Sequence, residues 1–237
     1  MEIKVFNNKK EASNFIADLF LNEVKLNPKL KIGFATGKTY KEIYKRIIYL
    51  TKKRKVDLSK IKIYQIDEYL NTKDKYFTIN YLKNYLIKPL NLNKNQVHTI
   101  KESYNFYKEH NRDKIDNLDF IFLGVGEDSH IAFNEPGSYK DSKVRIIKLL
   151  DITRKRKFRN LNNSPKLAIT IGIKEILDSK KIVLAAFGKD KSKPILNSFS
   201  GKILKQYPAS FLQKHKDFTL VLDKAAKSER FIKIHRL

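Results

Sequence analysis

Short apolar runs typical of buried strands alternate with amphipathic helical segments along the 237-residue chain. Strands are predicted at residues 2–6, 30–35, 61–66, near 97, 120–123, 144–149, 181–187 and 218–222. Helices are predicted at residues 12–24 (capped by Asn7 or Asn8), from 40 onward, 76–86, 104–110, 169–177 and after 193. This alternation predicts an α/β fold: an open, mostly parallel, doubly wound (Rossmann-like) sheet with helices on both faces. Because no linker or repeat interrupts it, residues 1–237 are expected to form a single domain.

The composition excludes several kinds of functional site and indicates where the protein works. The chain has no cysteine, which excludes disulfides, a thiol nucleophile and cysteine-based metal sites. The five histidines show no ligand spacing such as HExxH, so no metal site is expected. The first residues are too polar for a signal peptide, and no run approaches the roughly 20 apolar residues of a membrane span. We therefore expect a cytoplasmic protein that does not enter the membrane.

The charge is strongly basic, with 50 Lys and Arg against 25 Asp and Glu and a net charge of +25. Such a balance attracts polyanions, including nucleic acid. The lysines are spread through every segment rather than concentrated in one, which is typical of a solvated basic surface. Nucleic acid is therefore an unlikely partner, and attraction of small anionic substrates is the milder consequence.

Residues 119–138 hold the densest cluster of groups that can transfer protons. The apolar run 120–123 is followed by Gly124 and Gly126, where a chain can turn tightly or let a ligand approach its backbone. Glu127, Asp128, His130 and Glu135 then fall within nine residues. Open α/β sheets keep their sites just beyond the carboxyl ends of their strands. This stretch is the candidate active site, and a merely charged surface loop is the alternative.

Two other strand ends carry polar residues. Thr36 to Thr39 join the strand at 30–35 to a helix, and their hydroxyl and backbone N–H groups beside a positive helix end suit a phosphate. An ordinary helix start explains the same residues equally well. Asp67, Glu68 and Tyr69 stand at the end of the strand at 61–66, where a carboxylate could be a catalytic base or a helix cap.

Four segments together resemble one enzyme family. They are ATGKT at 35–39, IDEY at 66–69, GVGEDSHIAFNEPGS at 124–138 and PASFLQKHKDF at 208–218. In this order they are similar to the isomerase-type glucosamine-6-phosphate deaminases, within the wider sugar-phosphate isomerase and phosphogluconolactonase group. The resemblance implies conversion of glucosamine 6-phosphate and water to fructose 6-phosphate and ammonia. The substrate's own amino group leaves as ammonia, so no cofactor is expected and a small sugar phosphate is the implied partner.

The resemblance also implies a role for each site residue. Asp67 corresponds to the base that moves a proton from C2 to C1, and His130 to the group that opens the pyranose ring. Asp128 and Glu135 correspond to partners that orient and charge the imidazole, which is the side chain whose usual pKa suits proton transfer near neutrality. The substrate-binding set is Thr36, Gly37, Lys38, Thr39, Gly124, Arg159 and Lys191. Residues 153–165 correspond to a mobile lid.

Three positions depart from the family pattern. Ser129 replaces a glycine between Asp128 and His130, which could shift the turn, and Lys38 stands where a small residue is common. Ile147 replaces a lysine of the allosterically activated hexameric members, although Arg145 and Ser138 are kept. We therefore expect a non-allosteric enzyme that is a monomer or a small homo-oligomer.

Other functions remain as alternatives. A related sugar-phosphate isomerase or lactonase shares part of the pattern, but the FNEPGS continuation and the separate Asp67 argue against it. A non-catalytic sugar-phosphate-binding protein is the alternative from outside the enzymes, and the intact set of Asp67, Asp128, His130 and Glu135 argues for catalysis.

Overall fold

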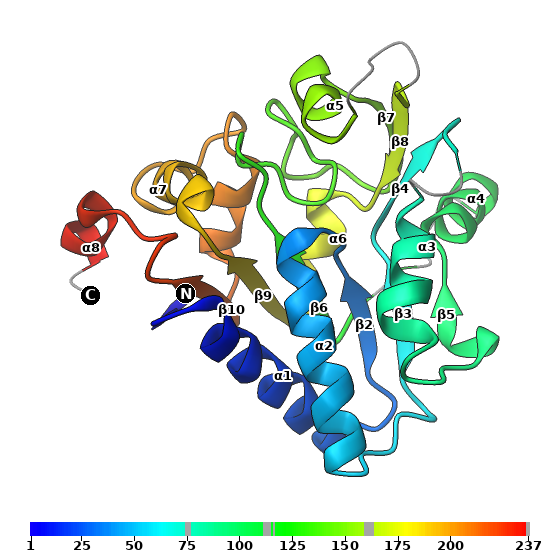
Figure 1. Cartoon of the computed structure of the whole chain (residues 1–237). Coiled ribbons are helices and arrows are strands. Elements are labelled where there is room, and N and C mark those ends of the chain that lie inside the picture. The colour runs from blue at the N-terminus through cyan, green and yellow to red at the C-terminus, as the bar shows by residue number, and fades with distance from the viewer. Residues whose placement is uncertain (74–76, 111–114, 116, 159–163, 236–237) are drawn as a thin grey trace.

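The computed structural model describes residues 1–73, 77–110, 115, 117–158 and 164–235. Seven parallel strands form its central sheet, in the order β1-β10-β9-β6-β2-β3-β5 (Figure 1). The strands are β1 (Glu2–Phe6), β2 (Lys31–Phe34), β3 (Lys62–Gln65), β5 (Val97–His98), β6 (Phe120–Gly124), β9 (Lys181–Ala186) and β10 (Phe218–Asp223). The predicted α/β fold with a mostly parallel sheet is confirmed.

Helices cover both faces of this sheet. In Figure 1, α1 (Lys9–Leu26) and α2 (Lys38–Lys53) lie side by side in front of it. After β5 the chain crosses the sheet in the opposite direction, so right-handed connections place the later helices behind it. The remaining helices are α3 (Thr78–Leu82), α4 (Ile100–His110), α5 (Asp151–Lys157), α6 (Ile173–Leu177), α7 (Ser192–Phe199) and α8 (Glu229–His235). Shorter turns are η2 (Lys83–Ile87), η3 (Lys94–Gln96), η4 (Lys189–Lys191) and η5 (Pro208–Lys214).

The first helix begins where its cap predicts. The side chain of Asn8 accepts hydrogen bonds from the backbone N–H groups of Lys10 and Glu11, both at 3.0 Å. These donors have no partner inside the helix, so the cap stabilises the first turn by about 1 kcal/mol. The apolar face of α1 then packs on the sheet, which makes the helix part of the main core.

A second, antiparallel sheet has the order β4-β8-β7 and consists of β4 (Asp67–Leu70), β8 (Leu167–Thr170) and β7 (Arg145–Lys148). The predicted helix over 169–177 is therefore wrong in its first part: residues 167–170 form a strand, and α6 begins only at Ile173. Apolar residues at helical spacing suggested a helix, but β-branched Ile169 and Thr170 suit a strand and Gly172 interrupts the helical pattern. Backbone pairing with the distant strands β4 and β7 makes residues 167–170 a strand.

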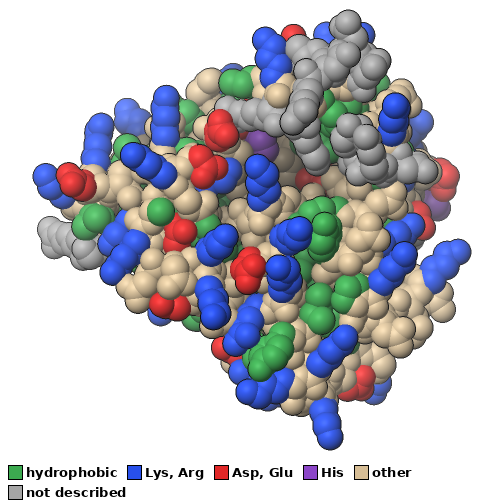
Figure 2. Space-filling view, in the orientation of Figure 1, with side chains coloured by type: hydrophobic (Ala, Val, Ile, Leu, Met, Phe, Trp, Pro, Cys, Tyr) green, Lys and Arg blue, Asp and Glu red, His purple; other side chains and the backbone are tan. Residues whose placement is uncertain are grey.

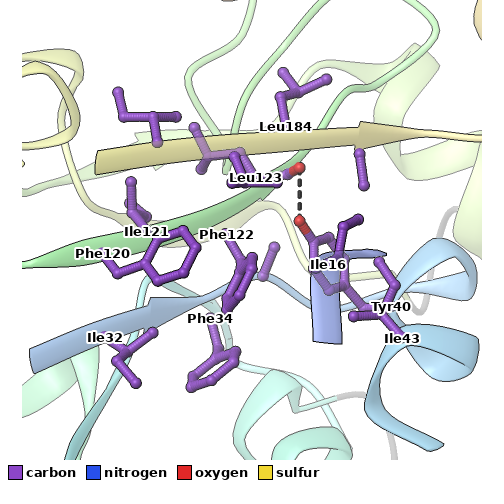
Figure 3. Packing of buried hydrophobic residues seen from close by; sticks show 14 of the residues in the cluster. Ile16, Ile32, Phe34, Tyr40, Ile43, Phe120, Ile121, Phe122, Leu123 and Leu184 are labelled. Atoms are coloured by element: carbon purple, nitrogen blue, oxygen red, sulfur yellow. Dashed lines mark hydrogen bonds between the residues drawn. The ribbon is translucent and has the colours of Figure 1, made fainter. Parts of the chain in front are cut away.

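Buried side chains form two cores. The larger lies between the central sheet and its helices, where Phe34 and Phe122 stack with ring centroids 5.2 Å apart (Figure 3). In the same view the buried hydroxyl of Tyr40 donates a 2.7 Å hydrogen bond to the carbonyl of Leu123, which ties α2 to the end of β6. The smaller core lies against the second sheet and contains Tyr69, Phe133, Leu149, Phe158 and Ala168.

On the face shown in Figure 2, Lys and Arg side chains spread over the whole molecule with acidic side chains between them. Within the described ranges, no helix is both long and apolar enough to cross a bilayer.

Candidate active site

The central sheet reverses its winding direction between the neighbouring strands β2 and β6. From β2 the chain continues to β3 and β5, whereas from β6 it continues to β9 and β10. The two connections leave on opposite faces, which opens a crevice beyond the carboxyl ends of both strands, the usual ligand site of such folds. A cavity of about 620 Å³ lies there. Its lining includes residues 35–42, Asp67, Tyr69, residues 124–127, His130, Phe133, Asp190 and Lys191.

A tight loop after β6 places His130 at this cavity. The N–H of Gly126 donates to the carbonyl of His130 at 2.9 Å, and the N–H of Ser129 donates to the carbonyl of Gly126 at 3.0 Å. The imidazole lies against Gly126 so closely that a Cβ there would be 2.2 Å from its Cε1 atom. A residue with a side chain at position 126 would therefore displace the ring.

Ser129, where a glycine was expected, has a left-handed backbone with φ of 70°. That conformation suits glycine better than serine, which explains the family preference. Here the buried hydroxyl of Ser129 donates to the carbonyl of Pro194 at 3.3 Å, so the loop also contacts α7.

Asp128 and His130 form a close pair. The Nδ1 atom of His130 lies 2.6 Å from the Asp128 carboxylate, and both side chains are mostly buried. Burial of Asp128 favours its neutral form, but the hydrogen bond and charge of His130 outweigh this effect and lower the pKa of Asp128 to about 2. The carboxylate is thus ionised near neutral pH. Because Nδ1 contacts Asp128, Nε2 is the nitrogen that can exchange a proton with a ligand.

Asp67 and Glu68 point to opposite faces of β4, as neighbours in a strand do. Asp67 lines the cavity and is 8% exposed. Glu68 is buried, and its carboxylate accepts the N–H groups of Thr78 at 2.7 Å and Ile79 at 3.2 Å, at the start of α3. Glu68 is therefore the helix cap of this motif, and Asp67 is the carboxylate available to a ligand.

Thr170 at the end of β8 links the elements that carry Asp67 and His130. Its backbone pairs with Asp67 on one side and with Arg145 on the other. Its hydroxyl accepts the N–H of Phe133, three residues after His130, at 3.0 Å. The base candidate and the histidine loop are thus held through the same residue of the second sheet.

The predicted anion loop is partly helical. The helix α2 begins at Lys38, so Lys38 and Thr39 belong to its first turn rather than to a loop, and only Thr36 and Gly37 precede it. Gly37 is the N-cap, with φ of 111° and no side-chain hydrogen bond to the helix. The first N–H groups of a helix have no partner within it and form a positive end. All four residues line the cavity, so this end can receive an anion there.

Lys191 and Gly124 also line this cavity, as predicted for substrate-binding residues. Lys191 ends η4, which follows a turn at Gly188, and its Nζ atom lies 3.4 Å from the carboxylate of Asp190. Arg159, the remaining predicted anion contact, lies outside the described residues, as does part of the predicted lid at 153–165. Among the side chains that are described, no three His, Cys, Asp or Glu residues cluster as metal ligands do.

Glu135 faces a different space from the other predicted residues. It lines a second cavity of about 350 Å³, together with Ser138, Arg145 and Ile147, and its carboxylate accepts the N–H of Leu150 at 2.8 Å. Its role as a partner of the imidazole stays a prediction.

Tyr69 also lines the first cavity and was not predicted as a site residue. Burial raises its pKa, and the negative charges of Asp67, Glu68 and Glu135 raise it further. Its position two residues after Asp67, on the same face of a strand, is the signal that could have identified it.

Comparisons with known proteins show the family of the chain. The family described as glucosamine-6-phosphate isomerases/6-phosphogluconolactonases matches residues 8–221. A curated glucosamine-6-phosphate deaminase of Clostridium botulinum (strain Kyoto / Type A2) is 35% identical over 244 residues, which cover 98% of this chain and 100% of that protein. One from Mycoplasma mycoides subsp. mycoides SC is 32% identical over 240 residues, covering 97% of each.

Solved structures of a deaminase and of a lactonase also superpose on this chain. A monomeric glucosamine-6-phosphate deaminase superposes with a TM-score of 0.85 at 27% identity, covering 95% of this chain and 98% of that one. The 6-phosphogluconolactonase of Trypanosoma brucei superposes with a TM-score of 0.73 at 16% identity, covering 95% and 97%. The second similarity shows a shared fold alone.

Proposed function

The chain belongs to the family of glucosamine-6-phosphate isomerases and 6-phosphogluconolactonases, and we propose that it is a glucosamine-6-phosphate deaminase. It converts glucosamine 6-phosphate and water to fructose 6-phosphate and ammonia. One observation carries the proposal: Asp67, His130 (which pairs with Asp128) and the start of α2 border a single cavity at the point where the sheet reverses. Proteins at 32–35% identity over almost the whole chain bear the deaminase name, whereas the lactonase similarity is one of fold.

His130 and Asp67 share the proton transfers of the reaction. His130 exchanges a proton between the ring oxygen and the C1 hydroxyl, which opens the pyranose. Asp67 then takes the proton from C2 and returns it to C1, while a proton passes from the amino nitrogen to O1, so that the aldehyde becomes an alcohol and the amino group becomes an imine at C2. Water hydrolyses the imine, leaving the ketone and ammonia, and the atoms balance without a cofactor. Asp128, ionised beside the imidazole, keeps Nδ1 occupied and so directs Nε2 to the substrate.

The phosphate of the substrate binds in the same cavity to Thr36, Gly37, Lys38 and Thr39. The free N–H groups at the start of α2 supply directed donors, and Lys191 adds a positive charge from another strand end. Arg159 completes the anion contacts in this proposal, and Glu135 supports the imidazole. We further propose that the enzyme works in the cytoplasm as a monomer or small homo-oligomer, since a monomeric deaminase shares its fold.

The test measures ammonia and fructose 6-phosphate from glucosamine 6-phosphate with the wild type and with Asp67→Asn. Removing a general base costs roughly 10²- to 10⁴-fold in rate, so Asp67→Asn should lose at least 100-fold in kcat and keep its KM. Glu127→Gln is the matched control, because it removes an exposed carboxylate from the wall of the same cavity. A wild type that forms neither product, or an Asp67→Asn variant with full activity, contradicts the assignment.

A further inference from the structure

Three tyrosine hydroxyl groups hold the backbone carbonyls at the edge of the proposed phosphate site. Tyr44 donates to the carbonyl of Ala35, directly before the loop, and Tyr40 donates to the carbonyl of Leu123 at 2.7 Å. Tyr81, which comes from α3 rather than α2, donates to the carbonyl of Gly37 at 2.7 Å. The carbonyl oxygens, which would repel a phosphate, are thus engaged by side chains.

The hydrogen bond from Tyr81 acts on the peptide between Gly37 and Lys38, at the start of α2. In a trans peptide the C=O and the following N–H point in opposite directions. Holding the Gly37 carbonyl toward Tyr81 and toward the N–H of Tyr40 (3.1 Å) therefore turns the N–H of Lys38 out of the helix start. That donor is among those that the helix itself leaves unpaired.

Gly37 would allow this peptide to rotate, and the hydrogen bond from the Tyr81 hydroxyl prevents that rotation. Its φ of 111° is a conformation that residues with a side chain rarely adopt, and among the residues that the structure describes no non-adjacent one has an atom within 4 Å of where its Cβ would be. A glycine in open space can let the peptide rotate, which would turn the carbonyl of Gly37 toward the anion. Burial and the neighbouring Tyr85 raise the pKa of Tyr81, so its hydroxyl stays a donor at physiological pH.

We propose that Tyr81 is a positioning residue for phosphate: its hydroxyl fixes the Gly37–Lys38 peptide with the N–H of Lys38 facing the anion. This inference rests on the proposed function for the identity of the substrate, but it concerns anion binding at the start of α2 and can be measured without catalysis.

The test replaces Tyr81 with phenylalanine, which keeps the ring and its packing. Losing one neutral hydrogen bond should weaken binding roughly 3- to 10-fold. Tyr81→Phe should therefore raise KM for glucosamine 6-phosphate and the inhibition constant of inorganic phosphate by this factor, with kcat almost unchanged. Tyr85→Phe is the matched control: its ring lies 4.6 Å from that of Tyr81, and its hydroxyl has no hydrogen bond to any residue in the described ranges.

The outcomes separate the two proposals. If the wild type is active but Tyr81→Phe binds phosphate as the wild type does, or loses kcat without a change in KM, the role of Tyr81 is refuted and the deaminase assignment stands. If the wild type shows no deamination, the assignment fails. Calorimetric titration of both proteins with inorganic phosphate then still decides the role of Tyr81, because weaker binding by the variant supports it and equal binding refutes it.

Discussion

Replacing Gly126 with alanine should disable His130 although the histidine itself is not mutated. A methyl group at position 126 would lie 2.2 Å from Cε1 and 2.3 Å from Nδ1 of the imidazole. Ordinary contacts begin at 3.4 Å, so the ring must retreat by about 1.2 Å, the difference between 3.4 and 2.2 Å. The backbone of Gly126 lies outside the left-handed region, so alanine adopts it and the effect comes from the ring.

A displacement of this size is large for catalysis. Misplacing a reacting group by about 1 Å costs roughly 100-fold in rate, and the ring also cannot keep its 2.6 Å contact with Asp128. We expect kcat, measured by ammonia release, to fall at least 100-fold, while the inhibition constant of phosphate stays at its wild-type value because α2 is unchanged. Gly201→Ala is the control, since no non-adjacent residue in the described part of the chain comes within 4 Å of the added methyl. A Gly126→Ala enzyme with wild-type kcat would refute the proposed role of His130.

Two further predictions concern stability. Asp128 has a folded-state pKa of about 2 against an ordinary 3.8. This difference stabilises the folded protein by about 2 kcal/mol above pH ~4, and the stabilisation is lost as the pH falls toward 2. In urea unfolding, Asp128→Asn should therefore lose less stability over that range than the wild type, and equal losses would contradict the pairing with His130. Tyr40→Phe removes the buried hydrogen bond from the Tyr40 hydroxyl to the carbonyl of Leu123, which should cost about 1 kcal/mol in the same assay, and an unchanged unfolding midpoint would argue against that bond.

The central sheet was predictable because each of its longer strands is a continuous apolar run. Residues 182–186 and 218–222 are buried on both faces, and such strands need no distant information to be recognised. The cap at Asn8 was likewise local. The second sheet was not predictable in this way. The strand β8 exists because Asp67 pairs with Thr170 across about 100 residues, and a short apolar segment alone does not distinguish that pairing from a helix.

The candidate site, too, could be predicted only in part from the sequence. Asp67, His130 and Lys191 could be expected to meet because parallel strands bring their carboxyl ends to one edge. Tyr81 and Tyr69 were missed because tyrosines in short amphipathic segments are typical of core packing. The contact of Gly126 with His130 was invisible for another reason: a glycine in a turn motif suggests backbone freedom, whereas here its lack of a side chain makes room for a ring.

Thr170 has a consequence for the order in which the enzyme matures. A ribosome releases the chain from its N-terminus, so the segments carrying Asp67 and His130 both emerge before the strand that holds them in place. Until residues 167–170 insert between β4 and β7, the pairing with Asp67 and the hydrogen bond from Phe133 cannot form. The second sheet therefore closes around Asp67 and the histidine loop only after this late strand has been translated.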